Sequence, residues 1–325
     1  MSKRAPMRIA TLLPSATEIV SALGLAGDIV GVTHECDFPP EVRDRPRIVR
    51  GKIDSAHLAG AEINAQVEAS LARGEGLYEI DLDALRNLRP DLLITQDLCD
   101  VCALPGTDVD AVIAGLPLPP RVLRLHPHAL SDILGDIVRV GAATGREAEA
   151  ERLVARLRGR IDRVEAAVRG RPRPRVCCLE WLDPPFCGGH WMPEIVELAG
   201  GREVVGLAGR PSFQVDWSQI AAAHPDVVVL VLCGFDVART RKEAEAVAAR
   251  AEWRSLPAVR AGCVYATDAS SYFSRSGPRI VDGLEILAAL FHRDAAAWPT
   301  PPGSWAPLDS VVAHAPGHPH AGGVP

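Results

Sequence analysis

Residues 146–169 constrain the fold of this chain most, because strand and helix patterns of the same kind lie on both sides of them. Apolar residues recur there every three or four positions between arginine and glutamate, the pattern of a helix with one buried stripe. At about 1.5 Å per residue, such a helix spans roughly 36 Å. Gly145 separates it from a second helical pattern at residues 131–144, and Pro172 ends it. The predicted buried stripe consists of Leu153, Leu157, Ile161, Val164 and Val168.

Each flanking half alternates apolar strand-length runs with helical patterns, which is typical of an α/β fold with mostly parallel strands. The halves also echo each other, since residues 18–24 resemble residues 194–200, and residues 85–94 resemble residues 220–229. We therefore predict two α/β lobes, each a mostly parallel sheet flanked by helices, joined by one long helix. Strands are expected at residues 8–13, 29–32, 91–95, 121–125, 175–181, 226–232 and 263–267.

The expected boundaries follow from this pattern. An N-terminal lobe covers residues 7–127, a connecting helical segment covers 128–172, and a C-terminal lobe covers 173–293. His126 and His128 fall at the junction of the first lobe. Residues 294–325 are rich in Pro, Gly, Ala and His, a composition that predicts a disordered tail.

Charge and hydropathy exclude two classes of partner. The net charge is -6 and no basic stripe is clustered, which argues against nucleic acid. No apolar run approaches the roughly 20 residues that span a bilayer. The first residues show neither a signal-peptide core nor a lipid-attachment cysteine, so a cytoplasmic location with reduced cysteines is expected for the chain as written, and a periplasmic or other extracytoplasmic one if translation starts upstream.

Polar, aromatic and sulfur side chains gather directly after the predicted strands. Ligands of open parallel sheets bind beyond the carboxyl ends of the strands, so these loops are expected to face one cleft between the lobes. Ser15 is also predicted to cap the first helix, with Glu18 completing a capping box. The candidate ligand-binding residues are Ser15, His34, Glu35, Cys36, Asp37, Gln96, Asp97, Trp181, Asp183, His190, Trp191, Phe235, Tyr272, Phe273 and Arg275.

These candidates differ in the chemistry they offer. The aromatic rings supply rigid area for stacking on a macrocycle, whereas Trp217 and Trp253 are expected in the core. Arg275 is either a partner for a ligand carboxylate or phosphate, or a surface arginine. His34 and His190 are each expected to bond to loop backbone, with ligation of a cobalt or iron centre as the alternative.

Cys99 and Cys102 form a Cys-x-x-Cys pair, the spacing at which two thiolates share a zinc ion or form a redox disulfide. His34 and Cys36 would complete a zinc site if the two loops meet. A second such pair is absent from the sequence, so buried, inert cysteines remain the alternative.

Several of these stretches together resemble the cobalamin-binding members of the class III substrate-binding proteins, the iron-complex and vitamin B12 receptors of ABC importers. The resemblance covers residues 8–292. It is most specific at residues 13–19, 33–39, 96–102, 180–185 together with 190–191, and 279–283. It implies two lobes joined by a rigid helix, a corrinoid or other metal chelate held between them, and an ABC permease as partner. A long helix resists bending, so little lobe closure is expected.

Two other classes of function stay open. One is an enzyme or chaperone of corrinoid or metallo-tetrapyrrole metabolism, although no nucleophile elbow, phosphate loop or zinc-protease motif is present. The other is a zinc or thiol sensor that uses Cys36, Cys99 and Cys102. We expect binding without catalysis, with cobalamin or a related corrinoid as ligand.

Overall fold

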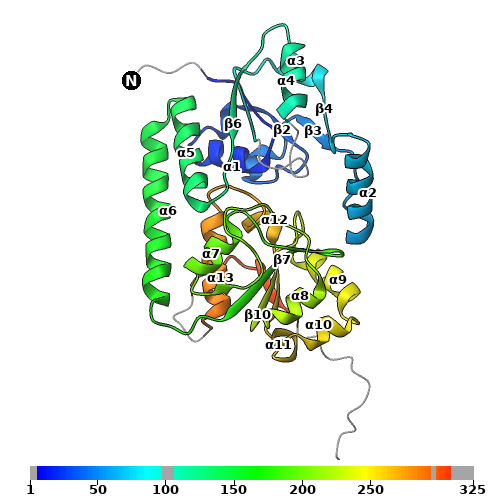
Figure 1. Cartoon of the computed structure of the whole chain (residues 1–325). Helices are drawn as coiled ribbons and strands as arrows, with labels where there is room; N and C mark the ends of the chain where they lie inside the picture. Colours follow the sequence, from blue (N-terminus) through cyan, green and yellow to red (C-terminus); the bar gives the residue numbers. More distant parts are fainter. Residues whose placement is uncertain (1–5, 97–105, 294–297, 309–325) are drawn as a thin grey trace, which may run out of the picture.

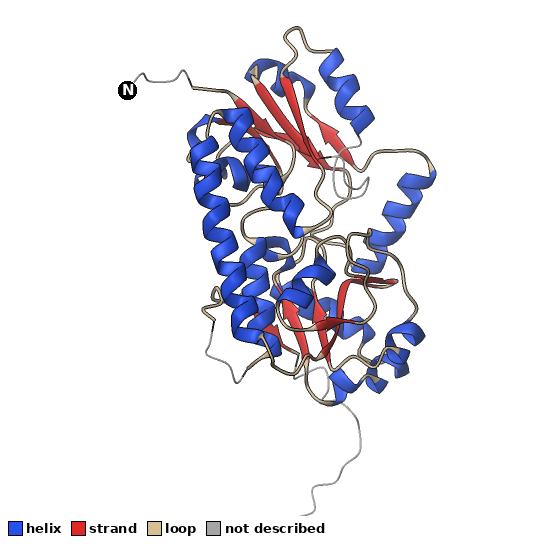
Figure 2. Ribbon diagram, turned by 60° about the vertical axis from the view of Figure 1, so that its left-hand side comes forward, coloured by secondary structure: helices blue, strands red, loops and turns tan. Residues whose placement is uncertain are grey.

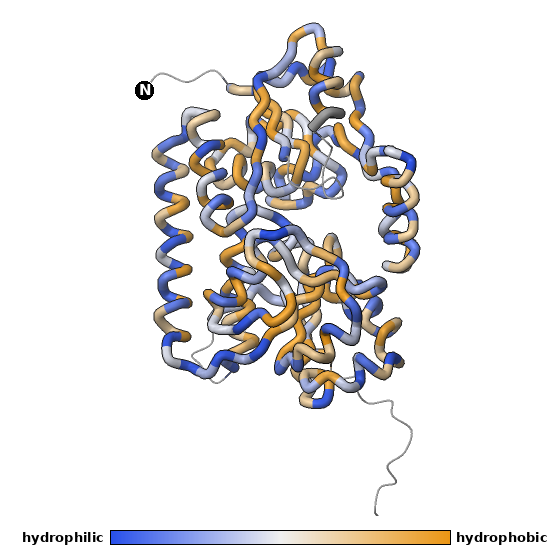
Figure 3. Tube along the Cα trace, viewed as in Figure 1, coloured by the Kyte–Doolittle hydropathy of each residue, from blue (hydrophilic) through white to orange (hydrophobic). Residues whose placement is uncertain are grey.

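Two mixed sheets of short apolar strands organise the chain, each with helices on both faces (Figures 1 and 2). The computed structural model describes residues 6–96, 106–293 and 298–308. The strands at the centre of each lobe are among the most hydrophobic segments of the chain (Figure 3). This architecture confirms the predicted two-lobed α/β fold.

The sheet of the N-terminal lobe has the strand order β4-β3-β2-β1-β5-β6, and all neighbours are parallel except β3 and β4. Its helices include α1 (Pro14–Ala22), α2 (Gly60–Ala72), α3 (Leu82–Leu88) and α4 (Gly106–Ala114). Its strands are β1 (Ile9–Thr11), β2 (Ile29–Thr33), β3 (Arg47–Gly51), β4 (Tyr78–Ile80), β5 (Leu92–Gln96) and β6 (Arg121–Leu125).

The sheet of the C-terminal lobe has the order β12-β11-β10-β7-β8, with β9 paired to β7. Its strands are β7 (Arg175–Leu182), β8 (Pro185–Cys187), β9 (Arg202–Glu203), β10 (Val227–Leu230), β11 (Val264–Thr267) and β12 (Trp305–Pro307). Its helices are α7 (Met192–Leu198), α8 (Trp217–Ala222), α9 (Val237–Val247), α10 (Ala251–Ser255), α11 (Pro257–Arg260), α12 (Ala269–Tyr272) and α13 (Ile280–Phe291).

Helix α6 (Glu147–Val168) joins the lobes along one side of the molecule, which confirms the predicted long helix (Figure 1). All five residues of the predicted stripe are buried. α6 packs tightly on α5 (Leu130–Thr144), where a Cβ atom on Gly141 would lie 2.5 Å from the Cβ atom of Ala150. Towards the C-terminal lobe, Arg160 donates from Nε to Glu285 of α13 at 2.9 Å. α6 is thus packed against both lobes along its length.

One cluster of buried apolar side chains runs through both lobes on the α6 side. It extends from Ile9 in the first sheet through Leu157 of α6 to Val229 in the second sheet. Separate clusters cover the other face of each sheet. The lobes therefore share a hydrophobic core on the α6 side.

Residues 52–77 leave the N-terminal lobe between β3 and β4 and return to it. The backbone amide of Lys52 donates to the carbonyl of Leu77 at 2.9 Å, which closes the base of this excursion. The excursion carries α2, which lies on the opposite side of the molecule from α6 in both views (Figures 1 and 2). The strand and helix patterns read from the sequence did not include β3, α2 or β4.

The predicted capping box at Ser15 and Glu18 is wrong. Helix α1 starts at Pro14, its N-cap is Leu13, and no side chain caps it. Ser15 lies inside the helix, and the Glu18 carboxylate accepts hydrogen bonds from two arginines of the C-terminal lobe instead. A long-range ion pair therefore replaces the local cap.

Part of the predicted disordered tail is also ordered. β12 pairs antiparallel with β11, and Leu308 is buried. Trp298 and Trp305 pack against the core that both lobes share. This apolar surface explains why the segment folds despite its Pro- and Gly-rich composition. Residues 294–297 and 309–325, with the histidines of the tail, lie outside the described residues.

No helix in the described ranges has the length and apolar character needed to cross a bilayer.

Candidate ligand-binding site

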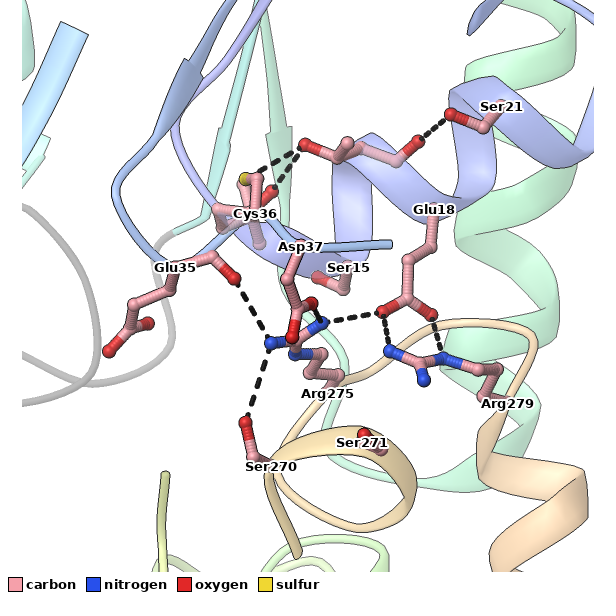
Figure 4. Close-up of polar contacts among 12 residues, drawn as sticks. Ser15, Glu18, Ser21, Glu35, Cys36, Asp37, Ser270, Ser271, Arg275 and Arg279 are labelled. Carbon is pink, nitrogen blue, oxygen red and sulfur yellow. Dashed lines mark hydrogen bonds and ion pairs between the residues drawn. The ribbon is translucent and has the colours of Figure 1, made fainter. Parts of the chain in front are cut away.

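Arg275 lies where the loops of the two lobes meet (Figure 4). Its guanidinium donates to the carboxylates of Glu18 at 3.1 Å and Asp37 at 2.6 Å, and to the carbonyl of Glu35 at 3.1 Å. Burial disfavours the charge of Arg275, but the two carboxylates still hold its pKa above the ordinary value. This geometry joins the lobes, and it favours a structural role over the predicted contact of Arg275 with a ligand anion.

Arg279 adds a second arginine to this contact between the lobes. Sequence reasoning did not include it among the candidate site residues. It donates to both carboxylate oxygens of Glu18, at 3.0 and 2.6 Å. Its guanidinium also lies 4.2 Å from the ring centroid of Phe38 and 5.5 Å from that of Tyr272. The available signal was its position four residues after Arg275, which places two arginines near the start of α13.

Three other candidates pack the loops together. The hydroxyls of Ser15 and Ser276 lie 3.3 Å apart and are buried. The indole of Trp191 donates to the carbonyl of Phe273 at 3.0 Å, and both side chains are buried in the shared core. These contacts give Ser15, Trp191 and Phe273 a place in the packing between loops.

Cys36 is buried between two threonines. Its sulfur lies 3.1 Å from the hydroxyl of Thr17 and 3.2 Å from that of Thr33. Burial raises the pKa of the thiol, and the hydrogen bonds to the threonines oppose that rise. A buried, protonated thiol is a poor nucleophile and a poor metal ligand.

His34 and Glu35 are accessible polar side chains of the loop after β2, as is Asp37 beside them. His34 Nδ1 lies 3.3 Å from the carbonyl of Val49, and Nε2 lies 4.0 Å from a carboxylate oxygen of Glu35. The Glu35 side chain points away from Arg275 (Figure 4). Both side chains are therefore accessible from outside the protein.

Trp181, near the end of β7, and Phe235, in the loop after β10, form an aromatic pair in the C-terminal lobe. Their ring centroids lie 5.2 Å apart, and the guanidinium of Arg239 lies 4.5 Å from the centroid of Phe235. Trp181 is half-buried, whereas Phe235 is buried. Asp183 does not join them, because its carboxylate lies 3.6 Å from Arg250 in an exposed pair.

His190 stacks on a histidine of the lobe junction. Its ring centroid lies 5.8 Å from that of His128, whose Nε2 lies 2.9 Å from Nε2 of His126. The buried Nε2 of His190 has no hydrogen-bond partner among the described residues. Burial lowers the pKa of His190, and the neighbouring His128 lowers it further. His190 is therefore neutral at pH 7.

The predicted metal site cannot be assembled from the described part of the chain. There, no group of three or more His, Cys, Asp or Glu side chains is arranged to hold a metal ion. Gln96 ends β5 and is buried. Asp97, Cys99 and Cys102 lie outside the described residues, so the zinc prediction stays a prediction.

The sequence matches one family model along most of its length. The model, described as periplasmic binding protein, aligns with residues 9–271.

Individual relatives cover nearly the whole chain at low identity. An uncharacterized ABC transporter substrate-binding lipoprotein of Bacillus subtilis, YvrC, is 24% identical over 90% of this chain and 82% of its own. A vitamin B12-binding protein of Photorhabdus laumondii is 21% identical over 87% of each chain. A solved periplasmic heme binding protein from Pseudomonas aeruginosa superposes with a TM-score of 0.69 at 21% identity, covering 93% of this chain and 98% of its own. That likeness establishes the shared fold.

Proposed function

Since this chain belongs to the periplasmic binding protein family, we propose that it is the substrate-binding protein of an ABC importer, with cobalamin or a related corrinoid as its ligand. The observation that carries the choice of ligand is the similarity to a vitamin B12-binding protein along 87% of the chain. The motifs at residues 33–39 and 96–102 support the same choice. Binding rather than catalysis is the general role of this family.

The ligand is proposed to lie between an N-terminal lobe of residues 7–127 and a C-terminal lobe of residues 173–293. His34 and Glu35 supply accessible polar groups from the first lobe. Trp181 and Tyr272 supply partly exposed aromatic rings from the second. Flat rings give a macrocycle large contact area, and a few polar groups set its orientation.

The relatives also bear on location and partner. They are named as lipoprotein or vitamin B12-binding protein, and the family as periplasmic, so the expected cytoplasmic location gains no support from them. We propose an extracytoplasmic location and an ABC permease that receives the ligand.

Haem is the second candidate ligand. A solved structure named as a heme binding protein superposes on 93% of this chain, and haem is likewise a flat metal chelate. An imidazole side chain such as that of His34 suits iron as well as cobalt. The choice between the two ligands therefore has to be made by titration.

The test is a titration of the purified protein with cyanocobalamin, hydroxocobalamin, haem and a ferric siderophore, with visible spectra and melting temperature as readouts. A corrinoid is expected to raise the melting temperature, since a ligand that binds only the folded state stabilises it. His34→Ala should weaken binding, while His57→Ala, at a histidine that is also exposed, should not. If only haem gives a response, haem rather than cobalamin is the ligand. Conversion of the corrinoid to a product would favour the alternative function, an enzyme of corrinoid metabolism.

A further inference from the structure

Residues 53–72, here called the arm, reach from the N-terminal lobe to the C-terminal lobe on the side opposite α6. The arm begins just after β3 and ends with α2. Of the residues in α2, only Gly60 and Ile63 are buried, and both lie in its first turns. The arm therefore touches the C-terminal lobe with one end and exposes most of its helix.

Arg239 of α9 holds this end of the arm by its backbone. It donates to the carbonyls of Ser55 and Ala56, both at 3.3 Å, and to that of Leu58. The same guanidinium stacks on Phe235 and pairs with Glu243 at 2.7 Å. One side chain thus connects the arm to the aromatic pair of the candidate site.

Glu243 holds the start of α2. Its second carboxylate oxygen accepts the backbone amide of Gly60 at 3.0 Å. A Cβ atom on Gly60 would lie 2.8 Å from that oxygen and 3.5 Å from the Trp181 ring, so glycine permits the close approach. Trp181 consequently lies under the docked end of the arm.

The apolar part of this contact is small. Ile63 joins the core cluster of the C-terminal lobe, and Ile53, Leu58 and Val67 pack against it only partly buried. On the α6 side, in contrast, the two lobes share one continuous cluster. If one side of the molecule opens, the arm side exposes far less apolar surface and costs less free energy.

We propose that the arm is a detachable clasp: it docks on α9 through Arg239, Glu243 and Ile63, and it releases while the lobes stay joined at α6. Release uncovers Trp181 and Phe235 and opens the region between the lobes on the side away from α6. This last step rests on the proposed function: a metal chelate bound between the lobes would enter and leave past the arm.

Hydrogen–deuterium exchange of the full-length, ligand-free protein tests the clasp. Amides of α2 that are bonded within the helix are expected to exchange faster than those in the middle of α6, because α2 opens locally. Arg239→Ala should speed exchange in α2 by about tenfold or more and leave α6 unchanged. Arg241→Ala, an exposed arginine two positions along the same helix, is the matched control and should change neither.

Equal protection of α2 and α6 in the unmodified protein would overturn the proposal, as would a rise in exchange that covers both helices after Arg239→Ala. These outcomes need no ligand, so they separate the clasp from the function. With cyanocobalamin or haem added, dissociation should be faster from Arg239→Ala than from Arg241→Ala. Equal dissociation rates in the two variants would show that the ligand does not leave past the arm. If neither compound binds, the proposed ligands are wrong, and the clasp is still tested by the exchange data.

Discussion

Two arginines of the C-terminal lobe, Arg275 and Arg239, bind segments of the N-terminal lobe in different surroundings. Arg275 is 7% exposed and pairs with Glu18, which is 2% exposed. Arg239 is 19% exposed, and its partners in the arm are the backbone carbonyls of residues 55, 56 and 58. The first contact joins buried charges beside a shared core, whereas the second fixes a loop at the edge of the molecule.

This difference predicts which join can open. Separating a buried ion pair leaves charges without partners in a dry environment, and that costs several kcal/mol. Carbonyls at an exposed edge can exchange an arginine for water at a net cost of roughly 0.5–1.5 kcal/mol per hydrogen bond. The Arg275 join is therefore permanent under native conditions, and the Arg239 join is reversible.

The largest effect is expected from Glu18→Gln. This change removes the carboxylate that Arg275 and Arg279 share, so the buried Arg275 and the partly buried Arg279 lose a counter-charge that both of them contact. The free energy of unfolding should fall by roughly 3–5 kcal/mol, measured by denaturant titration. Glu245→Gln, on the exposed face of α9, is the control and should stay within about 0.5 kcal/mol. A similar small loss for Glu18→Gln would mean that the charges are solvated and the join is not permanent.

Ile63→Ala addresses the arm and is expected to act locally. The side chain is buried in the C-terminal cluster, so its truncation should weaken docking by about 2 kcal/mol, at the low end for buried isoleucine. Because the rest of the fold stays closed when the arm opens, exchange in α2 should rise while the midpoint of global unfolding moves less. Leu71→Ala, an exposed residue of the same helix, is the matched control. A fall in global stability that matches the local change would show that arm and core unfold as one unit.

A third contact, the stack of His128 on His190, should make stability depend on pH. Burial and His128 lower the pKa of His190 in the folded protein below the ordinary value of 6.5, which holds in the unfolded chain. At a pH between the folded and the unfolded pKa, the unfolded chain therefore binds more protons than the folded one. Stability should therefore fall as the pH drops through about 6.5 towards the folded pKa.

His190→Asn should flatten this pH dependence, and asparagine tolerates the backbone φ of 50° at this position. His57→Asn is the control, since His57 is exposed. Denaturant midpoints from about pH 7.5 to 5.5 provide the measurement. An equal slope in both variants would contradict the assignment to His190.

Periodicity was enough to predict the long helix and the alternation of strands and helices. The buried stripe of α6 is visible in the sequence as a regular spacing of apolar residues. The strands β5, β7 and β10 are visible as short apolar runs. The arm has no comparable signal, because α2 buries only Gly60 and Ile63 and its sequence shows no regular apolar stripe. An element held by contacts to another lobe leaves little trace in local sequence.

The same limit applies to the site. Sequence reasoning placed Ser15, Asp37 and Arg275 after strands whose loops should meet. In the structure Arg275 donates to Asp37, and Ser15, inside α1, contacts Ser276, the neighbour of Arg275. Sequence reasoning did not reveal that the carboxylate of Glu18, 257 positions before Arg275, accepts a hydrogen bond from the Arg275 guanidinium. Whether a charged side chain faces a ligand or another residue depends on such distant partners, which spacing along the chain does not encode.

Cys36 offers a probe that distinguishes the two joins with the smallest disturbance. It lies next to Asp37, and its thiol is buried with a raised pKa, so it should react slowly with a thiol reagent at about pH 8, more slowly than the partly exposed Cys233. Peptide mapping by mass spectrometry assigns the label to each cysteine. Glu18→Gln should speed labelling of Cys36, because it loosens the Arg275 join, whereas Arg239→Ala should leave the rate unchanged, because the arm opens elsewhere. Faster labelling of Cys36 in Arg239→Ala would show that the two joins open together, and the distinction between a permanent and a reversible side would then fail.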